Sequence, residues 1–170
     1  MNNTTRLLLA AAVCVALAAC AKQVKEEPAP PPPPPAPAPA PPPPAPTGYQ
    51  PSDLDTDSCL RQRVVYFDFD KDIVKPEFAA ILSCHAQYLK DRSSSRISLE
   101  GNADERGTRE YNLGLGERRG NAVSSALQAN GGSAAQLTTI SYGEEKPTCT
   151  VSNEDCWSKN RRVEIVYTAK

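Results

Sequence analysis

The sequence predicts a small α/β sandwich in which helices cover one face of a sheet, and two observations carry this prediction. Short runs of β-branched and aromatic residues alternate with two segments of helical periodicity in the second half of the chain. Of the 17 prolines, 14 lie between Pro28 and Pro46, where alanine supplies the other residues. Because such a segment lacks the backbone donors of helix and sheet, the 170 residues do not form one globular domain.

The first 19 residues have the features of an export signal. Arg6 precedes the apolar run from Leu7 to Ala19, which as a helix is too short to cross a bilayer core of about 30 Å. One positive charge, a short apolar core and small residues at its end are typical of a signal peptide, which we expect to span residues 1–19. Leu17-Ala18-Ala19-Cys20 resembles the lipobox of bacterial lipoproteins, so we expect lipidation of Cys20. An ordinary signal with an incidental cysteine is the alternative.

Residues 20–58 are predicted to carry the lipidated N-terminus and a disordered linker rich in proline and alanine. As a polyproline II helix, residues 28–46 would reach about 59 Å at about 3.1 Å per residue. We interpret this segment as a spacer that holds the following domain away from a membrane. A linker without that role, or a proline-rich ligand for aromatic grooves, is the alternative.

Residues 59–170 are predicted to form one small domain. Its β-branched and aromatic runs predict strands at 64–69, 97–100, 137–142 and 163–167. Pro76 can open a helix whose apolar residues recur up to Leu89, and a second helix is expected over about 110–130, before Gly131 and Gly132. A short turn is expected around residues 157–161. Sequential β-α-β units favour parallel neighbouring strands.

Four of the six cysteines fall in the predicted domain. In an exported protein an even number suggests disulfides, and three connectivities are possible. Cys149 and Cys156 bracket a polar, turn-forming stretch that is easily closed, which leaves Cys59 to pair with Cys84. The alternative, a four-cysteine zinc site, is disfavoured because neither pair has the Cys-x2–4-Cys spacing. We expect no metal and no cofactor.

The charge balance disfavours one class of partner. With 19 Lys+Arg against 20 Asp+Glu, the chain lacks the basic excess typical of nucleic-acid binders, so no nucleic-acid partner is expected.

One arginine of the second predicted helix points to a candidate site. Arg119 lies one turn beyond Leu115 and so shares a face with core residues. Two interpretations remain open. Arg119 forms a partly buried salt bridge with Asp104, or the two face each other across a cleft and bind a zwitterion, Asp104 holding the ammonium and Arg119 the carboxylate.

Catalytic motifs are weak in this sequence. Asp68-Phe69-Asp70 after a hydrophobic strand superficially resembles the haloacid-dehalogenase motif, but the domain is too small and has no second Gly-Asp cluster for magnesium. His85, the single histidine, falls near the apolar face of the first helix, where a structural role is expected. No serine- or cysteine-centred nucleophile elbow is present. We therefore expect no enzymatic activity.

Five motifs carry a resemblance to a known family. They are YFDFDK (66–71), EGNADERGT (100–108), EYNLGLGERRGNAV (110–123), SYGEEKP (141–147) and SKNRRVEIVY (158–167). Across residues 59–170 the chain resembles the OmpA-like C-terminal domain family and, within it, the peptidoglycan-associated lipoproteins. The lipobox and the proline-rich arm agree with this resemblance. It implies a β-α-β-α-β-(α)-β domain with helices on one face of a small mixed sheet.

The resemblance implies noncovalent binding of the diaminopimelate-containing peptide of peptidoglycan. Asp104 and Arg119 would contact the zwitterionic end of the diaminopimelate side chain. The family's other site positions fall on Phe69, Asp70, Asn102, Arg106, Asn112 and Leu115. Asn102 stands where many members have histidine, so no pH dependence from imidazole is expected there.

The resemblance also implies a place in the cell envelope. With Ala21 after the lipidated cysteine, the protein is expected in the outer membrane, facing the periplasm. It would tether that membrane to the wall as part of the Tol-Pal system, which acts in envelope integrity and in constriction at division. The periplasmic protein TolB would use the same face of the domain, in competition with the wall.

Overall fold

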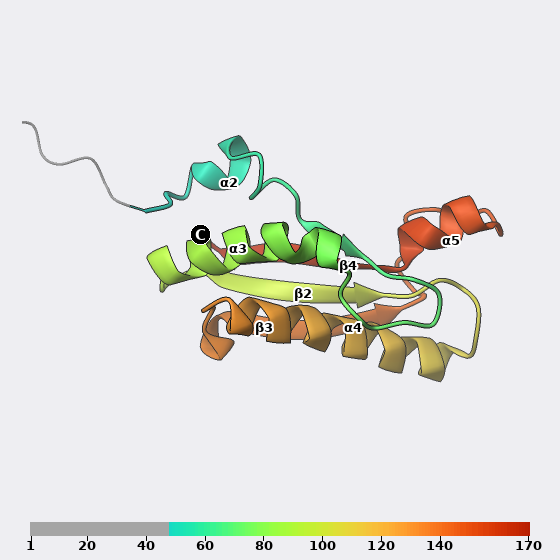
Figure 1. The fold of residues 1–170 in the computed structure, drawn as a ribbon. Helices are drawn as coiled ribbons and strands as arrows, with labels where there is room; N and C mark the ends of the chain where they lie inside the picture. The colour runs from blue at the N-terminus through green and yellow to red at the C-terminus, as the bar shows by residue number, and fades with distance from the viewer. Residues whose placement is uncertain (1–47) are drawn as a thin grey trace, which may run out of the picture. The chain divides into compact units, whose positions relative to one another are not determined.

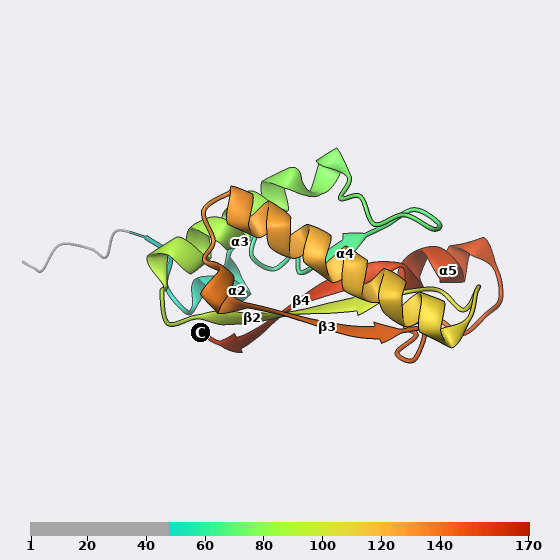
Figure 2. The same ribbon diagram turned by 90° about the horizontal axis from the view of Figure 1, so that it is seen from below.

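The computed structural model describes residues 48–170. The predicted signal peptide, the lipidation of Cys20 and the proline-rich segment lie outside the described residues. Within residues 48–170 the chain forms a four-stranded sheet whose one face is covered by helices α3 (Ala79–Asp91) and α4 (Arg109–Ala129). Figure 1 and Figure 2 show these two layers. The predicted α/β sandwich is confirmed.

The strands are β1 (Val64–Tyr66), β2 (Arg96–Asn102), β3 (Leu137–Gly143) and β4 (Arg162–Ala169). The shorter helical segments are α2 (Asp53–Thr56), η1 (Pro76–Phe78), η2 (Ala134–Gln136) and α5 (Glu154–Asn160). Local signals set several boundaries: Pro76 opens η1, and Thr108 caps α4 by accepting a hydrogen bond from the backbone amide of Tyr111 (3.2 Å). Of the helices in this part of the chain, none is long and apolar enough to span a bilayer.

The sheet has the strand order β1-β4-β2-β3 and is mixed, as the family resemblance implies. β2 and β3 are parallel neighbours, in agreement with the β-α-β expectation, whereas β4 runs antiparallel to both β1 and β2. The last strand is therefore inserted between the first two, and the expectation of parallel neighbours is wrong for β1 and β2. The β1–β4 ladder runs only from Val64 to Tyr66, which makes β1 a short edge strand.

Three elements differ from the sequence-based expectations. β1 ends at Tyr66 and not at residue 69: the backbone amide of Phe67 still donates to Arg161 O (2.9 Å), and the chain then turns, with the Lys71 amide donating to Asp68 O (3.2 Å). The turn expected around residues 157–161 belongs mostly to helix α5, which Asn153 caps by accepting from the Cys156 amide. Residues 53–56, in the stretch interpreted as linker, form α2.

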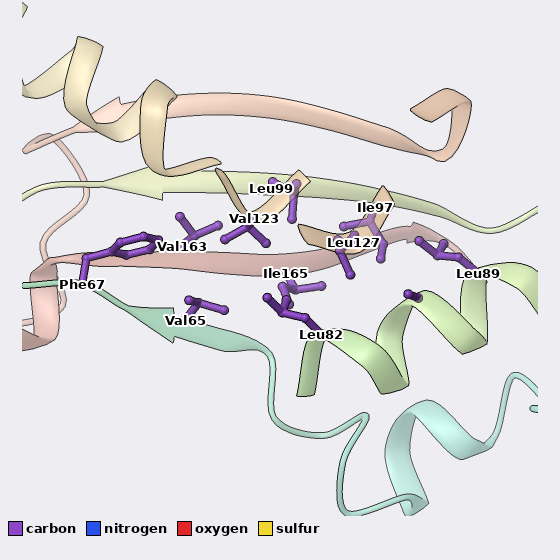
Figure 3. Close-up of a cluster of buried hydrophobic side chains, with 11 residues drawn as sticks. Val65, Phe67, Leu82, Leu89, Ile97, Leu99, Val123, Leu127, Val163 and Ile165 are labelled. Carbon is purple, nitrogen blue, oxygen red and sulfur yellow. The ribbon is translucent and has the colours of Figure 1, made fainter. Parts of the chain in front are cut away.

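A hydrophobic core fills the space between the sheet and the two long helices (Figure 3). Its buried members are Val65, Phe67, Leu82, Ala86, Leu89, Ile97, Leu99, Val123, Leu127, Val163 and Ile165. Burial of one large apolar side chain contributes about 1.5–3 kcal/mol relative to its exposure. This layer therefore fixes α4 on the sheet and positions the first turns of that helix, which form one wall of the candidate site.

A second buried cluster joins the segment before β1 to α3. Leu54 and Leu60 are fully buried against Tyr88 of α3. Tyr49 packs on the same ring, with the two ring centroids 6.1 Å apart. The compact part of the chain therefore starts at about Tyr49, earlier than the domain boundary expected at residue 59.

Both predicted disulfides are present. Cys59–Cys84 joins the segment before β1 to α3, with Cα atoms 6.3 Å apart. Cys149–Cys156 joins the loop after β3 to α5, with Cα atoms 5.1 Å apart. The pairing chosen among the three connectivities is confirmed, and no thiol of the four is left for a zinc site.

Helix α4 lies very close to the sheet because two glycines face each other at the contact. A Cβ atom on Gly101 of β2 would lie 1.9 Å from Gly116 O. A Cβ atom on Gly116 would lie 2.8 Å from Gly101 O. These distances are too short for real atoms, so only glycine permits this approach.

Gly101→Ala is expected to lower the free energy of unfolding by about 1–3 kcal/mol, because the added methyl group must push α4 away from the sheet. Urea denaturation measures the change. Gly114→Ala is the matched control, since its Cβ would meet only the end of the Arg118 side chain, at 3.4 Å. An unchanged urea denaturation midpoint for Gly101→Ala would show that α4 and β2 can move apart at no cost in stability.

Candidate functional site

A cavity of about 300 Å³ opens where the loop after β1, the loop after β2 and the first turns of α4 meet. These two loops and the start of α4 lie at the end of the sheet that also carries α5 (Figure 1 and Figure 2). Its lining residues are Phe69, Asp70, Asp104, Arg106, Gly107, Tyr111, Leu115 and Arg119. The structure therefore brings six of the eight predicted binding residues into one cavity, among them two acids and two arginines.

Arg119 is fully buried and lies on α4 one turn after Leu115, as the helical spacing predicts. Its Nε donates to Lys71 O (2.8 Å), its Nη1 to Asn102 O (2.9 Å) and its Nη2 to Asp68 O (3.1 Å). The carbonyls of Asp68 and Lys71 belong to the loop after β1, and that of Asn102 belongs to the last residue of β2, so the guanidinium ties the first loop to the point where the second loop begins. A guanidinium has five N–H donors, and one N–H on each terminal nitrogen has no partner among the described residues.

Within residues 48–170, Arg119 has no carboxylate at ion-pair distance. The salt bridge with Asp104 that the sequence left open is absent from this part of the chain, because Asp104 pairs with Arg106 and Arg161. Burial lowers the pKa of Arg119 to about 10, and the charge of Asp104 opposes this shift. A buried cation without a counter-ion is unfavourable, so a carboxylate entering the cavity would be stabilised there.

Asp104 is 4% exposed and forms ion pairs with Arg106 and Arg161. Its Oδ1 accepts from the backbone amide (3.1 Å) and Nε (3.2 Å) of Arg106. Its Oδ2 accepts from Nη2 of Arg106 (2.7 Å) and Nη1 of Arg161 (3.3 Å). Burial by itself would raise the pKa of Asp104, but these hydrogen bonds outweigh burial and hold the pKa below its ordinary value. The stability linked to this shift is present at neutral pH and is lost as the pH falls through the folded-state pKa.

The guanidinium of Arg106 lies between two aromatic rings. Its central carbon is 3.9 Å from the ring centroid of Phe69 and 4.1 Å from that of Trp157 in α5. Its Nη2 is also 3.5 Å from a carboxylate oxygen of Glu154. Stacking of this kind contributes about 0.5–1 kcal/mol at exposed sites. Arg106 and Phe69 thus form a cation–aromatic wall on the side of the cavity nearest to α5.

Two predicted binding residues do not line the cavity. Asn102 is buried, and its side-chain Nδ2 donates to Glu100 O (2.9 Å). Its backbone carbonyl accepts from Arg119. Asn112 is buried and donates to the carboxylate of Glu144. The Asn102 side chain thus bonds within β2 and that of Asn112 joins α4 to the loop after β3, so both have a supporting role beside the cavity.

Four residues at or near the cavity were not among the predicted binding residues. Tyr111 lines it and donates its hydroxyl to Asp70, a bond that raises the pKa of the tyrosine. Gly107 lines it with a φ of 118°, which favours glycine. Arg161 belongs to a polar run visible in the sequence before the last strand. Trp157 had no such signal, because its contact with Arg106 exists only after α5 has folded against the loop after β2.

Of the residues weighed for catalysis, His85 and Asp68 lie outside the cavity, whereas Asp70 lines it and accepts from the Tyr111 hydroxyl. His85 is fully buried, with Nδ1 2.7 Å from Tyr167 Oη and Nε2 3.0 Å from Gln62 O, as expected of a structural histidine. Asp68 forms an ion pair with Lys75 (3.0 Å). Among the residues the structure describes, no group of three or more His, Cys, Asp or Glu side chains is placed to hold a metal ion.

The chain is similar in sequence to one well-defined group of proteins. The model of the OmpA family matches residues 66–161. A peptidoglycan-associated lipoprotein of Pasteurella multocida (strain Pm70) is 40% identical over 167 residues, which are 98% of this chain and 100% of that relative. A peptidoglycan-associated lipoprotein of Pseudomonas putida is 48% identical over 120 residues, which are 70% of this chain and 72% of that relative.

Solved structures show the same fold. The crystal structure of the peptidoglycan-associated lipoprotein from Burkholderia pseudomallei matches with a TM-score of 0.67 and 46% identity, over 68% of this chain and 98% of that chain. The C-terminal domain of Helicobacter pylori MotB matches with a TM-score of 0.57 and 20% identity, over 62% of this chain and 83% of that chain. The second similarity concerns the fold alone.

Proposed function

The chain belongs to the OmpA family and, within it, to the peptidoglycan-associated lipoproteins, and on this basis we propose that its domain binds the diaminopimelate-containing peptide of peptidoglycan without catalysis. The side chain of diaminopimelate ends in an ammonium and a carboxylate. In the proposed complex Arg119 binds the carboxylate and Asp104 binds the ammonium, while Leu115 and Phe69 contact the methylene chain.

The observation that carries this proposal is a buried cation without a counter-ion that shares a cavity with a buried acid. Arg119 is fully buried, and the N–H groups it does not use for loop carbonyls can bind a carboxylate bidentately. Asp104 lines the same cavity and is held ionised. A zwitterion offers a carboxylate to Arg119 and an ammonium to Asp104 without adding net charge to the site, whereas a simple anion or cation offers only one of the two groups.

We extend the proposal to the whole chain through its family membership and its lipobox-like segment. A lipid on Cys20 would anchor the chain in the outer membrane, and the proline-rich segment would let the domain reach the wall. The chain would then act as a tether within the Tol-Pal system, with TolB competing with the wall for the cavity face.

Asp104→Asn is expected to reduce binding to purified sacculi by at least about tenfold, because the isosteric amide removes the negative charge that attracts the ammonium. A pull-down of residues 48–170 with sacculi, quantified over a concentration series, measures the change. Asp55→Asn is the matched control, since Asp55 is exposed on α2 and does not line the cavity. Circular dichroism verifies that each variant is folded.

The same incubation separates binding from hydrolysis. The proposal expects bound protein and no soluble muropeptides over time. Equal retention of wild type and a folded Asp104→Asn variant would exclude this cavity as the wall site. Steady release of muropeptides would identify a wall hydrolase instead.

A further inference from the structure

We propose that Arg106 competes with the ammonium group of the ligand for Asp104, and that the ligand must displace Arg106 from Asp104 in order to bind. This inference rests on the proposed function and concerns how tightly the same cavity binds its ligand. It assigns to Arg106 the role of a residue that lowers the affinity for ligands with an ammonium group.

The acceptor positions of Asp104 are already filled. A carboxylate offers about four lone-pair positions, and Asp104 accepts three hydrogen bonds from Arg106 and one from Arg161. An incoming ammonium group needs at least one of these positions. One of the two arginine side chains must therefore move when the ligand enters.

Arg106 is the side chain that can move. Its side chain is 30% exposed, whereas that of Arg161 is 7% exposed. Arg161 is further held by a bond from its Nε to Phe67 O (3.0 Å) and by an ion pair with Glu154. The side-chain bonds of Arg106 to Asp104 can break while the bond from its backbone amide stays in place.

A second anchoring place for Arg106 is already present. Glu154 of α5 lies 3.5 Å from Arg106 Nη2, and its side chain is 60% exposed. The Trp157 ring, 4.1 Å away, belongs to the same helix. Helix α5 is fixed by the Asn153 cap and by the Cys149–Cys156 disulfide. Arg106 can thus shift toward Glu154 without losing an ionic partner.

The competition lowers the affinity only for ligands that carry a cation. A ligand with only a carboxylate gains nothing by displacing Arg106 from Asp104. A ligand with an ammonium group replaces the arginine, but its apparent affinity is multiplied by the fraction of time that Asp104 is free of Arg106. Removal of Arg106 should therefore strengthen binding, and only for the ligand with the ammonium group.

Isothermal titration calorimetry with two peptides tests this inference. The first is the tripeptide L-alanyl-γ-D-glutamyl-meso-diaminopimelate, and the second is the same peptide without the distal amino group. Arg106→Gln is expected to bind the first peptide about tenfold more tightly than wild type does. This figure corresponds to a wild-type Asp104 that is free of Arg106 about one tenth of the time and is always free in the variant. It should bind the second peptide no more tightly than wild type. Arg109→Gln is the matched control, because Arg109 is 63% exposed and pairs with Glu145 away from the cavity.

The outcomes are distinct. Equal or weaker binding of the first peptide by Arg106→Gln would overturn the competition and assign Arg106 to direct ligand binding or to wall formation. Equal tightening for both peptides would also overturn it, because the effect would not depend on the ammonium group. Failure of the wild type to bind the first peptide would instead refute the proposed function itself.

Discussion

Replacing Arg119 with methionine is expected to abolish sacculus binding and to lower the free energy of unfolding by about 3–6 kcal/mol. The carbonyls of Asp68, Lys71 and Asn102 lose their buried donor, and each unsatisfied buried group costs about 1–3 kcal/mol. The bonds to Asp68 and Lys71 are only partly buried and their carbonyls can be hydrated, which places the sum in the lower part of the range for three buried groups. The two loops that frame the cavity also lose their common support. The cavity is therefore expected to lose its shape together with its charge.

Urea denaturation of residues 48–170 measures the stability, and the sacculus pull-down measures binding. Arg118→Met is the matched control, since Arg118 is the adjacent residue but is half-exposed and pairs with Asp72 at the surface. Arg119→Lys keeps the charge but lacks the planar fork, so it should fold better than Arg119→Met and still bind at least about tenfold more weakly than wild type. Normal stability of Arg119→Met would show that the three carbonyl bonds contribute little.

The double substitution Cys59→Ser with Cys84→Ser is expected to lower the free energy of unfolding by about 3.5 kcal/mol while sacculus binding is retained. The bond closes a loop with a sequence separation of 25, and the chain-entropy relation gives about 3.5 kcal/mol for a loop of that length. Neither cysteine lines the cavity, so binding should persist at temperatures where the variant is folded.

The second disulfide provides the comparison for this experiment. Removing Cys149–Cys156, with a sequence separation of 7, should lower the free energy of unfolding by a smaller amount, about 2.4 kcal/mol by the same relation. A larger loss from the shorter loop would contradict an entropic origin and would indicate that Cys149–Cys156 holds α5 by other means.

Local patterns predicted most of the fold because each element is encoded by neighbouring residues. The spacing between Leu115 and Arg119 placed both on the buried stripe of α4, and both are buried. The polar stretch between Cys149 and Cys156 indicated a closed loop, and the disulfide is present. The insertion of β4 between β1 and β2 had no local signal, because strand order depends on how distant segments pair.

The candidate site was predictable in its members but not in its contacts. The sequence could place Asp104 and Arg119 near each other, yet it could not show that Arg106 and Arg161 occupy Asp104. Arg161 reaches Asp104 across 57 positions of the chain, and Trp157 stacks on Arg106 only where α5 meets the loop after β2. Such contacts follow from tertiary packing, which no spacing rule encodes.

The Cys59–Cys84 bond would also determine how mechanical tension is carried past β1. In the proposed tether, tension between membrane and wall arrives from the N-terminal side. β1, an edge strand with a three-pair ladder, would peel readily from β4 if it were pulled from its start. The disulfide places residues 60–83, β1 among them, inside a covalently closed loop. In the proposed tether, tension would therefore bypass β1 and pass through the disulfide into α3, which is packed on the hydrophobic core.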